Sequence, residues 1–205
     1  MVDGGLAEAQ STLSPGRTEN EVAGAALRLM YSLGTEWMPI NPVVFSGPGS
    51  FRRFATSRAL RSGENATVSL SAMNDGYCAE STRSFGVGKT HPGSAGLRQT
   101  LRDSYDSLAG KLSPGVTLKS LFEDYADGVG KEGKAYVSIR GAGLSLTDLP
   151  LGNSIADGGD QKLEENNVIV MEARLEQPVN GSAQISDTIH ITDAGANKLT
   201  RYQEA

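Results

Sequence analysis

Histidine and cysteine, the side chains that most often carry nucleophilic or proton-transfer chemistry, are scarce in this sequence. His91 stands beside Pro92-Gly93 in a predicted loop, where we expect a surface position without a partner. His190 lies within a predicted strand, which favours a structural or edge-facing histidine. Cys78 follows Tyr77 in a strand expected to be buried, so an inert core thiol is favoured over a nucleophile. No Ser-His-Asp order can be assembled from these residues by motif.

Phosphate and nucleic-acid binding are also not indicated by the sequence. Gly141-x-Gly143 is too short for a glycine-rich phosphate loop, and it lies in a predicted strand rather than before a helix. The formal net charge of −5 argues against a general nucleic-acid-binding surface, so we do not expect nucleic acid as a direct ligand. A local basic patch is left open at four arginines: Arg52, Arg53, Arg58 and Arg61.

Length and composition predict one soluble globular domain. The 205 residues are 38% hydrophobic and 21% charged, which is enough for one well-buried core. The one cysteine cannot form an internal disulfide, as expected in a reducing compartment. No apolar run approaches the length of a membrane span, and residues 1–5 do not resemble a signal peptide. We expect a soluble intracellular protein without membrane contact, most simply cytoplasmic, with an organelle or the nucleus left open.

A short repeat indicates that the chain is built from two similar units. Leu13-Ser-Pro-Gly-Arg-Thr18 recurs as Leu112-Ser-Pro-Gly-Val-Thr117, and helix-like stretches flank both copies. In the first copy, Thr18 and Glu21 form a capping box ahead of apolar residues at helical spacing. In the second copy, Thr117 is the expected cap. Each unit therefore reads as helix, Pro-Gly turn, helix and then strands.

The strands of both units follow their second helices. Strand-like stretches in the first unit are 67–73 and 77–86, joined by a turn at 74–76. Those in the second unit are 134–139, 167–174 and 186–192. No linker rich in Pro, Gly or Ser separates the units, so we expect them to share one core.

Five segments, in order, resemble the methionine aminopeptidase, aminopeptidase P and creatinase superfamily: Ser46-Gly47 with Arg61–Glu64, Gly76–Phe85, Arg140–Leu144, Leu163–Glu172, and Asp187–Gly195 followed by Leu199-Thr200. The resemblance implies an α+β pita-bread fold, with two pseudo-symmetric helix-helix-strand units around a curved antiparallel sheet. It predicts a single domain over 1–205, with units of about 1–92 and 93–205. The amino-terminal lobe of aminopeptidase P and creatinase has no counterpart in this sequence.

The resemblance also implies a two-metal hydrolytic site of two aspartates, one histidine and two glutamates. In order, the matching positions hold Ser71 (or Ser69 if the strand register shifts), Glu80, Arg140, Glu172 and Ser186. The family's substrate-handling histidines match Phe54 and Thr147. Phe54, Ser71, Arg140, Thr147 and Ser186 are therefore the residues expected to line any ligand site.

These replacements argue against metal-dependent chemistry. A permanently charged arginine cannot coordinate a metal, and Arg140 would repel a divalent ion in a partly buried cleft. We therefore expect no metal ligands and no cofactor. The resemblance instead brings Arg140 together with Glu80 and Glu172, where a guanidinium can bridge two carboxylates. A buried ion cluster that preserves an inherited core is favoured over a catalytic role for these three residues.

The function most consistent with these residues is that of a catalytically inactive, peptidase-like domain. Such a domain would bind a protein or serve as a structural subunit, either as a homo-oligomer or within a larger complex. The alternative is a metal-independent, creatinase-like hydrolase or lyase that acts on a small molecule, with Glu80 and Glu172 as acid-base groups. Phe54 in place of a histidine counts against an identical creatinase mechanism.

Overall fold

The computed structural model describes residues 1–47, 54–129, 133–144, 150–152 and 159–202. The helices are α1 (Val2–Thr12), α2 (Glu19–Ser32), α3 (Pro92–Ala109) and α4 (Leu118–Val129). The strands are β1 (Val43–Ser46), β2 (Asn65–Asn74), β3 (Tyr77–Gly86), β4 (Lys134–Gly141), β5 (Pro150–Gly152), β6 (Val168–Gln177), β7 (Gly181–Thr192) and β8 (Gly195–Lys198). They form one antiparallel sheet in the order β1-β2-β3-β7-β6-β4-β5, with β8 beside β7.

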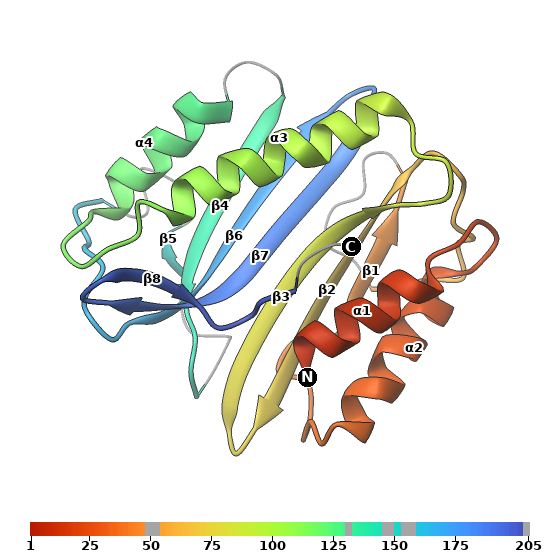
Figure 1. Ribbon diagram of the computed structural model, residues 1–205, viewed down its shortest axis with the longest axis horizontal. Helices are drawn as coiled ribbons and strands as arrows, with labels where there is room; N and C mark the ends of the chain where they lie inside the picture. Colours follow the sequence, from red (N-terminus) through yellow and green to blue (C-terminus); the bar gives the residue numbers. More distant parts are fainter. Residues whose placement is uncertain (48–53, 130–132, 145–149, 153–158, 203–205) are drawn as a thin grey trace.

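The four helices lie against one face of this sheet (Figure 1). α1 and α2 cover the strands of the first unit, and their apolar core includes Leu6, Met30 and Leu70. α3 and α4 cover the strands of the second unit around Tyr105 and Leu121. The strands thus turn alternate side chains toward the helices, and in β2 and β7 most side chains on the opposite face are buried as well.

The pseudo-symmetry predicted from the repeat extends to the backbone hydrogen bonds. Gly16 N donates to Leu60 O at 2.9 Å, and Gly115 N donates to Leu163 O at 2.8 Å. The threonine that directly precedes each second helix also forms an equivalent isolated bridge: Thr18 pairs with Ala59, and Thr117 with Lys162. The predicted α+β pita-bread fold, with two similar units around an antiparallel sheet, is confirmed.

Short sequence patterns predicted the start of α2 and the bounds of β3 correctly. The capping box of Thr18 and Glu21 is present, and the predicted strand at 77–86 matches β3. The predicted turn is a tight hairpin in which Asp75 and Gly76 both have positive φ, at 49° and 79°. The expected strand at 186–192 was too short, because β7 begins at Gly181. Its first residues pair with β6 although their composition is poor in strand formers.

Candidate functional site

The site lies on the face of the sheet opposite the helices, where strand alternation gathers polar side chains. One row across the strands pairs Ser69 with Thr82, Thr82 with Ser186, and Ser186 with Glu172. The next row pairs Ser71 with Glu80 and Val170 with Arg140. Because directly opposed residues share a face, these side chains all point away from the helices.

An ion cluster joins the two units on this face. The Arg140 guanidinium donates a hydrogen bond from Nη2 to Glu80 Oε2, and its Nη1 lies 3.9 Å from Glu172 Oε2. The Glu80 side chain is 0% exposed, that of Arg140 is 11% exposed and that of Glu172 is 18% exposed. The structure therefore brings together the three charged residues proposed from the sequence. Glu80 is fully enclosed, whereas Glu172 retains some contact with solvent.

The two serines considered for the first aspartate position have different partners. Ser69 Oγ lies 3.4 Å from Glu80 Oε1, next to the ion cluster. Ser71 Oγ instead donates to the backbone oxygen of Ile40 at 2.8 Å and accepts from the Ile40 amide at 3.1 Å. Ser69 also pairs with Thr82 at the centre of the sheet, as Glu172 pairs with Ser186 in the other unit. This placement favours Ser69, the residue matched if the register shifts, over Ser71 as the counterpart of the first aspartate.

Ser186 lies between the two units at the centre of the row. Its side chain is buried, and its Oγ has no hydrogen-bond partner among the described residues. The Nε of Arg140 is likewise buried without a hydrogen-bond partner in that part of the chain. The next residue, Asp187, points to the opposite face, toward the helices, because side chains alternate along β7.

The residues present do not fit a pair of divalent metal ions. A metal site of this kind needs several carboxylate or imidazole ligands around each cation. Ser69 and Ser186 supply neutral hydroxyls, and the guanidinium of Arg140 already occupies the side of Glu80 that faces the cluster. Among the described residues, no group of three His, Cys, Asp or Glu side chains is arranged to hold a metal ion.

The remaining predicted site residues lie elsewhere. Phe54 is 67% exposed, and Thr147 lies outside the described residues. His91 is at the surface, but the expectation that it lacks a partner was wrong. It is the N-cap of α3, and its Nδ1 accepts from Gly93 N at 3.1 Å. His190 Nε2 lies 3.3 Å from Asn166 Oδ1, and Cys78 is buried, as expected for a core position.

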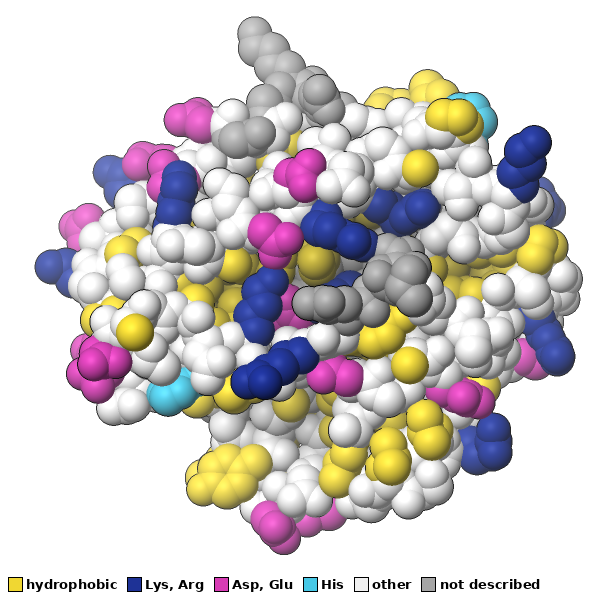
Figure 2. Space-filling model, in the orientation of Figure 1, with side chains coloured by type: hydrophobic (Ala, Val, Ile, Leu, Met, Phe, Trp, Pro, Cys, Tyr) yellow, Lys and Arg dark blue, Asp and Glu magenta, His cyan; other side chains and the backbone are white. Residues whose placement is uncertain are grey.

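Arg58 does not contribute a free cation to the basic patch that the sequence left open. This side chain makes two hydrogen bonds to the Glu64 carboxylate, at 2.8 and 2.7 Å, and so belongs to an ion pair. Arg52 and Arg53 lie outside the described residues. On the helix-covered side of the molecule, Lys and Arg side chains are interspersed with Asp and Glu (Figure 2). This distribution gives no continuous basic surface on the side shown.

A buried carboxylate that the sequence did not reveal lies at the start of α2, beside the end of β1. Glu19, the first residue of α2, accepts hydrogen bonds through Oε1 from Ser46 N and Oγ, both at 2.9 Å. Through Oε2 it accepts from Thr56 N at 3.1 Å and from Thr56 Oγ1 at 2.6 Å. The carboxylate thus connects Ser46, at the end of β1, with Thr56. The only signal in the sequence near Glu19 was the capping box at Thr18, which predicts the start of the helix but not the burial of this carboxylate.

Comparisons with known proteins give a consistent result. The sequence model of Metallopeptidase family M24 matches residues 1–193. The chain is 26% identical over 210 residues to an Xaa-Pro dipeptidase of Pyrococcus furiosus, covering 99% of the chain and 59% of the relative. The prolidase of Pyrococcus horikoshii has a similar structure, with a TM-score of 0.88 at 23% identity, and the chain covers 59% of it. Methionine aminopeptidase of Rickettsia prowazekii gives a TM-score of 0.87 at 16% identity, covering 98% of the chain and 92% of that protein.

The chain spans less than two thirds of the length of the dipeptidase relatives it matches. None of the helices in the described part of the chain combines the length and the hydropathy of a membrane span.

Proposed function

The chain belongs to metallopeptidase family M24. We propose that it is a member without metal-dependent peptidase activity, which serves in protein binding or as a structural subunit. Several of the matched relatives are named as dipeptidases. The proposal departs from those names because of the side chains at the positions that match the family's metal ligands.

The observation that carries the proposal is the ion pair between Arg140 and Glu80. The Coulomb interaction energy between two unit charges about 4 Å apart is roughly 4 kcal/mol at an effective dielectric constant near 20. A divalent ion beside Glu80 would meet about twice that repulsion from the Arg140 guanidinium. Ser69 and Ser186 offer no negative charge to offset it. The fixed cation thus supplies the positive charge that this enclosed glutamate requires.

Exposed apolar side chains support a binding or structural role. Large hydrophobic residues with substantial exposure include Trp37, Phe54, Tyr77, Leu144 and Leu199. Three of them are aromatic, a class of side chain that is enriched at protein interfaces. We propose that they contact a protein partner or a second copy of the chain.

Hydrolysis of an Xaa-Pro dipeptide in the presence of added Mn²⁺, Co²⁺ or Zn²⁺ tests the proposal. We expect no turnover above the uncatalysed rate, and no difference between samples with metal and samples with EDTA. Metal-dependent turnover that EDTA abolishes would contradict the proposal. A family relative with all five ligands serves as the positive control under the same conditions.

Metal-free catalysis is the second candidate function, and one observation favours keeping it. The carboxylate of Glu172 is partly exposed, whereas Glu80 is enclosed, so Glu172 can reach a small molecule as a general base. Activity that persists in EDTA and is lost in Glu172→Gln would support this alternative over the first proposal. Activity that survives in Glu172→Gln would exclude it.

A further inference from the structure

Residues 198–202 leave β8 and cross from the second unit to the first on the helix-covered face. Leu199 N donates to Thr188 O on β7 at 2.8 Å, which sets the segment against the centre of the sheet. Farther along, Tyr202 O accepts a hydrogen bond from Arg83 Nη2 on β3 at 3.1 Å. The segment therefore lies over the boundary where β3 of one unit meets β7 of the other.

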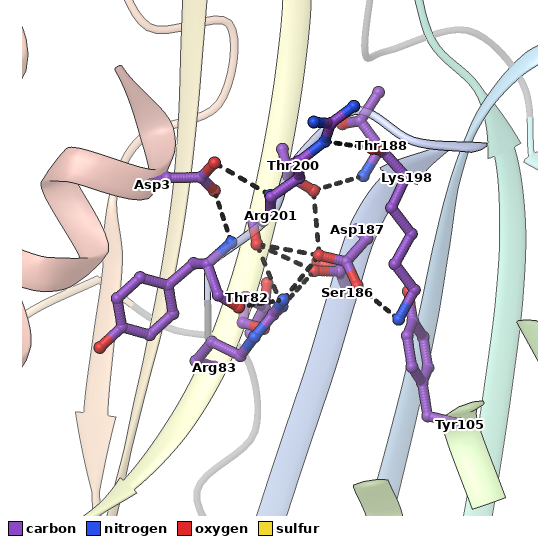
Figure 3. A network of polar contacts seen from close by, with 12 residues as sticks. Asp3, Thr82, Arg83, Tyr105, Ser186, Asp187, Thr188, Lys198, Thr200 and Arg201 are labelled. Carbon is purple, nitrogen blue, oxygen red and sulfur yellow. Dashed lines mark hydrogen bonds and ion pairs between the residues drawn. The ribbon is translucent and has the colours of Figure 1, made fainter. Parts of the chain in front are cut away.

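The buried carboxylate of Asp187 is the centre of the polar network beneath this segment (Figure 3). Its Oδ1 accepts from Arg83 Nη2 at 2.7 Å and from Thr200 Oγ1 at 2.9 Å. The Lys198 ammonium lies 3.6 Å from its Oδ2. Thr200 Oγ1 also accepts from Thr188 N at 3.1 Å, so one hydroxyl bridges β7 and the crossing segment. Side chains from both units thus converge on one carboxylate.

The far end of the segment is attached to the first unit. Asp3 of α1 accepts from Arg201 N at 2.9 Å and from Tyr202 N at 3.1 Å. The Tyr202 ring packs edge-on against Phe85, with ring centroids 6.0 Å apart. Polar and apolar contacts therefore secure both ends of the segment, one on each side of the boundary.

We propose that residues 198–202, together with Asp187, Arg83 and Asp3, form a latch that holds β3 against β7 and thereby fixes the spacing of the two units. The ion pair of Arg140 and Glu80 spans the same boundary on the other face. Glu80 and Ser186 are within a few residues of the latch residues Arg83 and Asp187, along the same two strands. The latch thus acts from behind the sheet on the strands that carry the ion cluster. It does not depend on the proposed function, because it concerns only how the two units are held.

Hydrogen exchange measured by mass spectrometry on Thr200→Val tests the latch. The substitution keeps the shape of the side chain and removes the hydroxyl that binds Asp187 and Thr188. Because a hydrogen bond to a charged group is among the stronger ones, we expect exchange about tenfold faster in peptides from 80–86 and 184–190. Peptides from β2 and β4 should exchange as in the wild type. Asp3→Ala, which cuts the other end of the segment, should give the same pattern.

Thr192→Val is the matched control. Its hydroxyl makes a 2.9 Å hydrogen bond to Gly195 O within the β7–β8 turn and does not cross the boundary. We expect this variant to leave exchange in β3 unchanged. Uniformly faster exchange throughout the sheet in Thr200→Val and Asp3→Ala would overturn the latch, since it would reflect global destabilisation. Exchange in 80–86 equal to that of the Thr192→Val control would overturn it as well.

Discussion

Arg140 on β4 reaches over β6 and β7 to donate a hydrogen bond to Glu80 on β3. The two residues belong to different units of the fold, and both side chains are almost fully enclosed. Glu172, on the strand next to Arg140, adds a second carboxylate at 3.9 Å. A cation fixed to the chain thus lies between two carboxylates on the face of the sheet opposite the helices.

Removal of this cation should destabilise the protein strongly. In Arg140→Met the enclosed Glu80 carboxylate would lose its charged partner, and breaking a buried pair in this way costs roughly 3–5 kcal/mol. Urea unfolding at neutral pH measures the difference. The double variant Glu80→Gln/Arg140→Met should recover much of the loss, because neither the charge nor its partner remains.

Lys111→Met provides the surface comparison. The substitution breaks the 2.9 Å ion pair between Lys111 and Asp124, whose side chains are 46% and 45% exposed, respectively. An exposed pair contributes about 0–1 kcal/mol. A loss in Arg140→Met no larger than the loss in Lys111→Met would show that the ion cluster is not a significant part of the core.

Restoring the family's ligand set should restore metal binding. In Ser69→Asp/Glu80→Asp/Arg140→His/Ser186→Glu, with Glu172 retained, the arginine is replaced by imidazole and four carboxylates surround the site. We expect this variant to bind Mn²⁺ or Co²⁺ in a calorimetric titration, with heats that the unaltered chain does not give.

The choice of serine can be tested in the same background. A second variant carries Ser71→Asp in place of Ser69→Asp and is otherwise the same. It should bind metal more weakly, because the Ser71 hydroxyl lies against the backbone of Ile40 rather than beside Glu80. Equal affinity in the two backgrounds would show that the placement of Ser69 does not matter.

Glu19→Gln should destabilise the protein although it keeps the shape of the side chain. The two carboxylate oxygens of Glu19 accept four hydrogen bonds from Ser46 and Thr56. A glutamine side chain keeps one of these oxygens and has an NH2 group, which cannot accept, in place of the other. Loss of a hydrogen bond to a charged group costs about 1.5–3 kcal/mol. Glu36→Gln, at an exposed carboxylate that accepts from the amides of Asp75 and Gly76, should change the free energy of unfolding much less.

Glu64 should make stability depend on pH in the acid range. Burial raises the pKa of its carboxyl, but the hydrogen bonds from Arg58 and from the Arg61 amide, with the charges of these arginines, outweigh burial and lower it. A lowered pKa in the folded state stabilises the protein above the unfolded pKa, and this stabilisation is lost as the pH falls through the folded value. The free energy of unfolding of Glu64→Gln should therefore decline less steeply than that of the wild type between neutral pH and about pH 3. Parallel curves for the two proteins would disprove this role.

The parts of the fold that local signals specify could be predicted from the sequence. The cap at Thr18 and the hairpin at Asp75-Gly76 depend on neighbouring residues alone. The start of β7 at Gly181 was missed because that stretch is held by pairing with β6, which composition does not reveal. Pairing partners come from distant parts of the chain, so strand ends are less certain than strand centres.

The candidate site was predictable only through the family resemblance. Nothing local to Glu80 or Arg140 indicates that they meet, because they are 60 residues apart in sequence and β6 and β7 lie between their strands. The burial of Glu19 was missed because its partners Ser46 and Thr56 are 27 and 37 residues away. The role of Asp187 was missed for the same reason, since Arg83 and Thr200 reach it from other elements.

We propose that the guanidinium of Arg140 takes the place of the metal ions in this family's site. Isothermal titration of the unaltered protein with Mn²⁺, Co²⁺ and Zn²⁺ at neutral pH, after dialysis against EDTA and then buffer, tests it most directly. We predict no saturable heat at stoichiometric concentrations of metal. Saturable binding of two ions per chain, lost in Glu80→Gln, would contradict the claim.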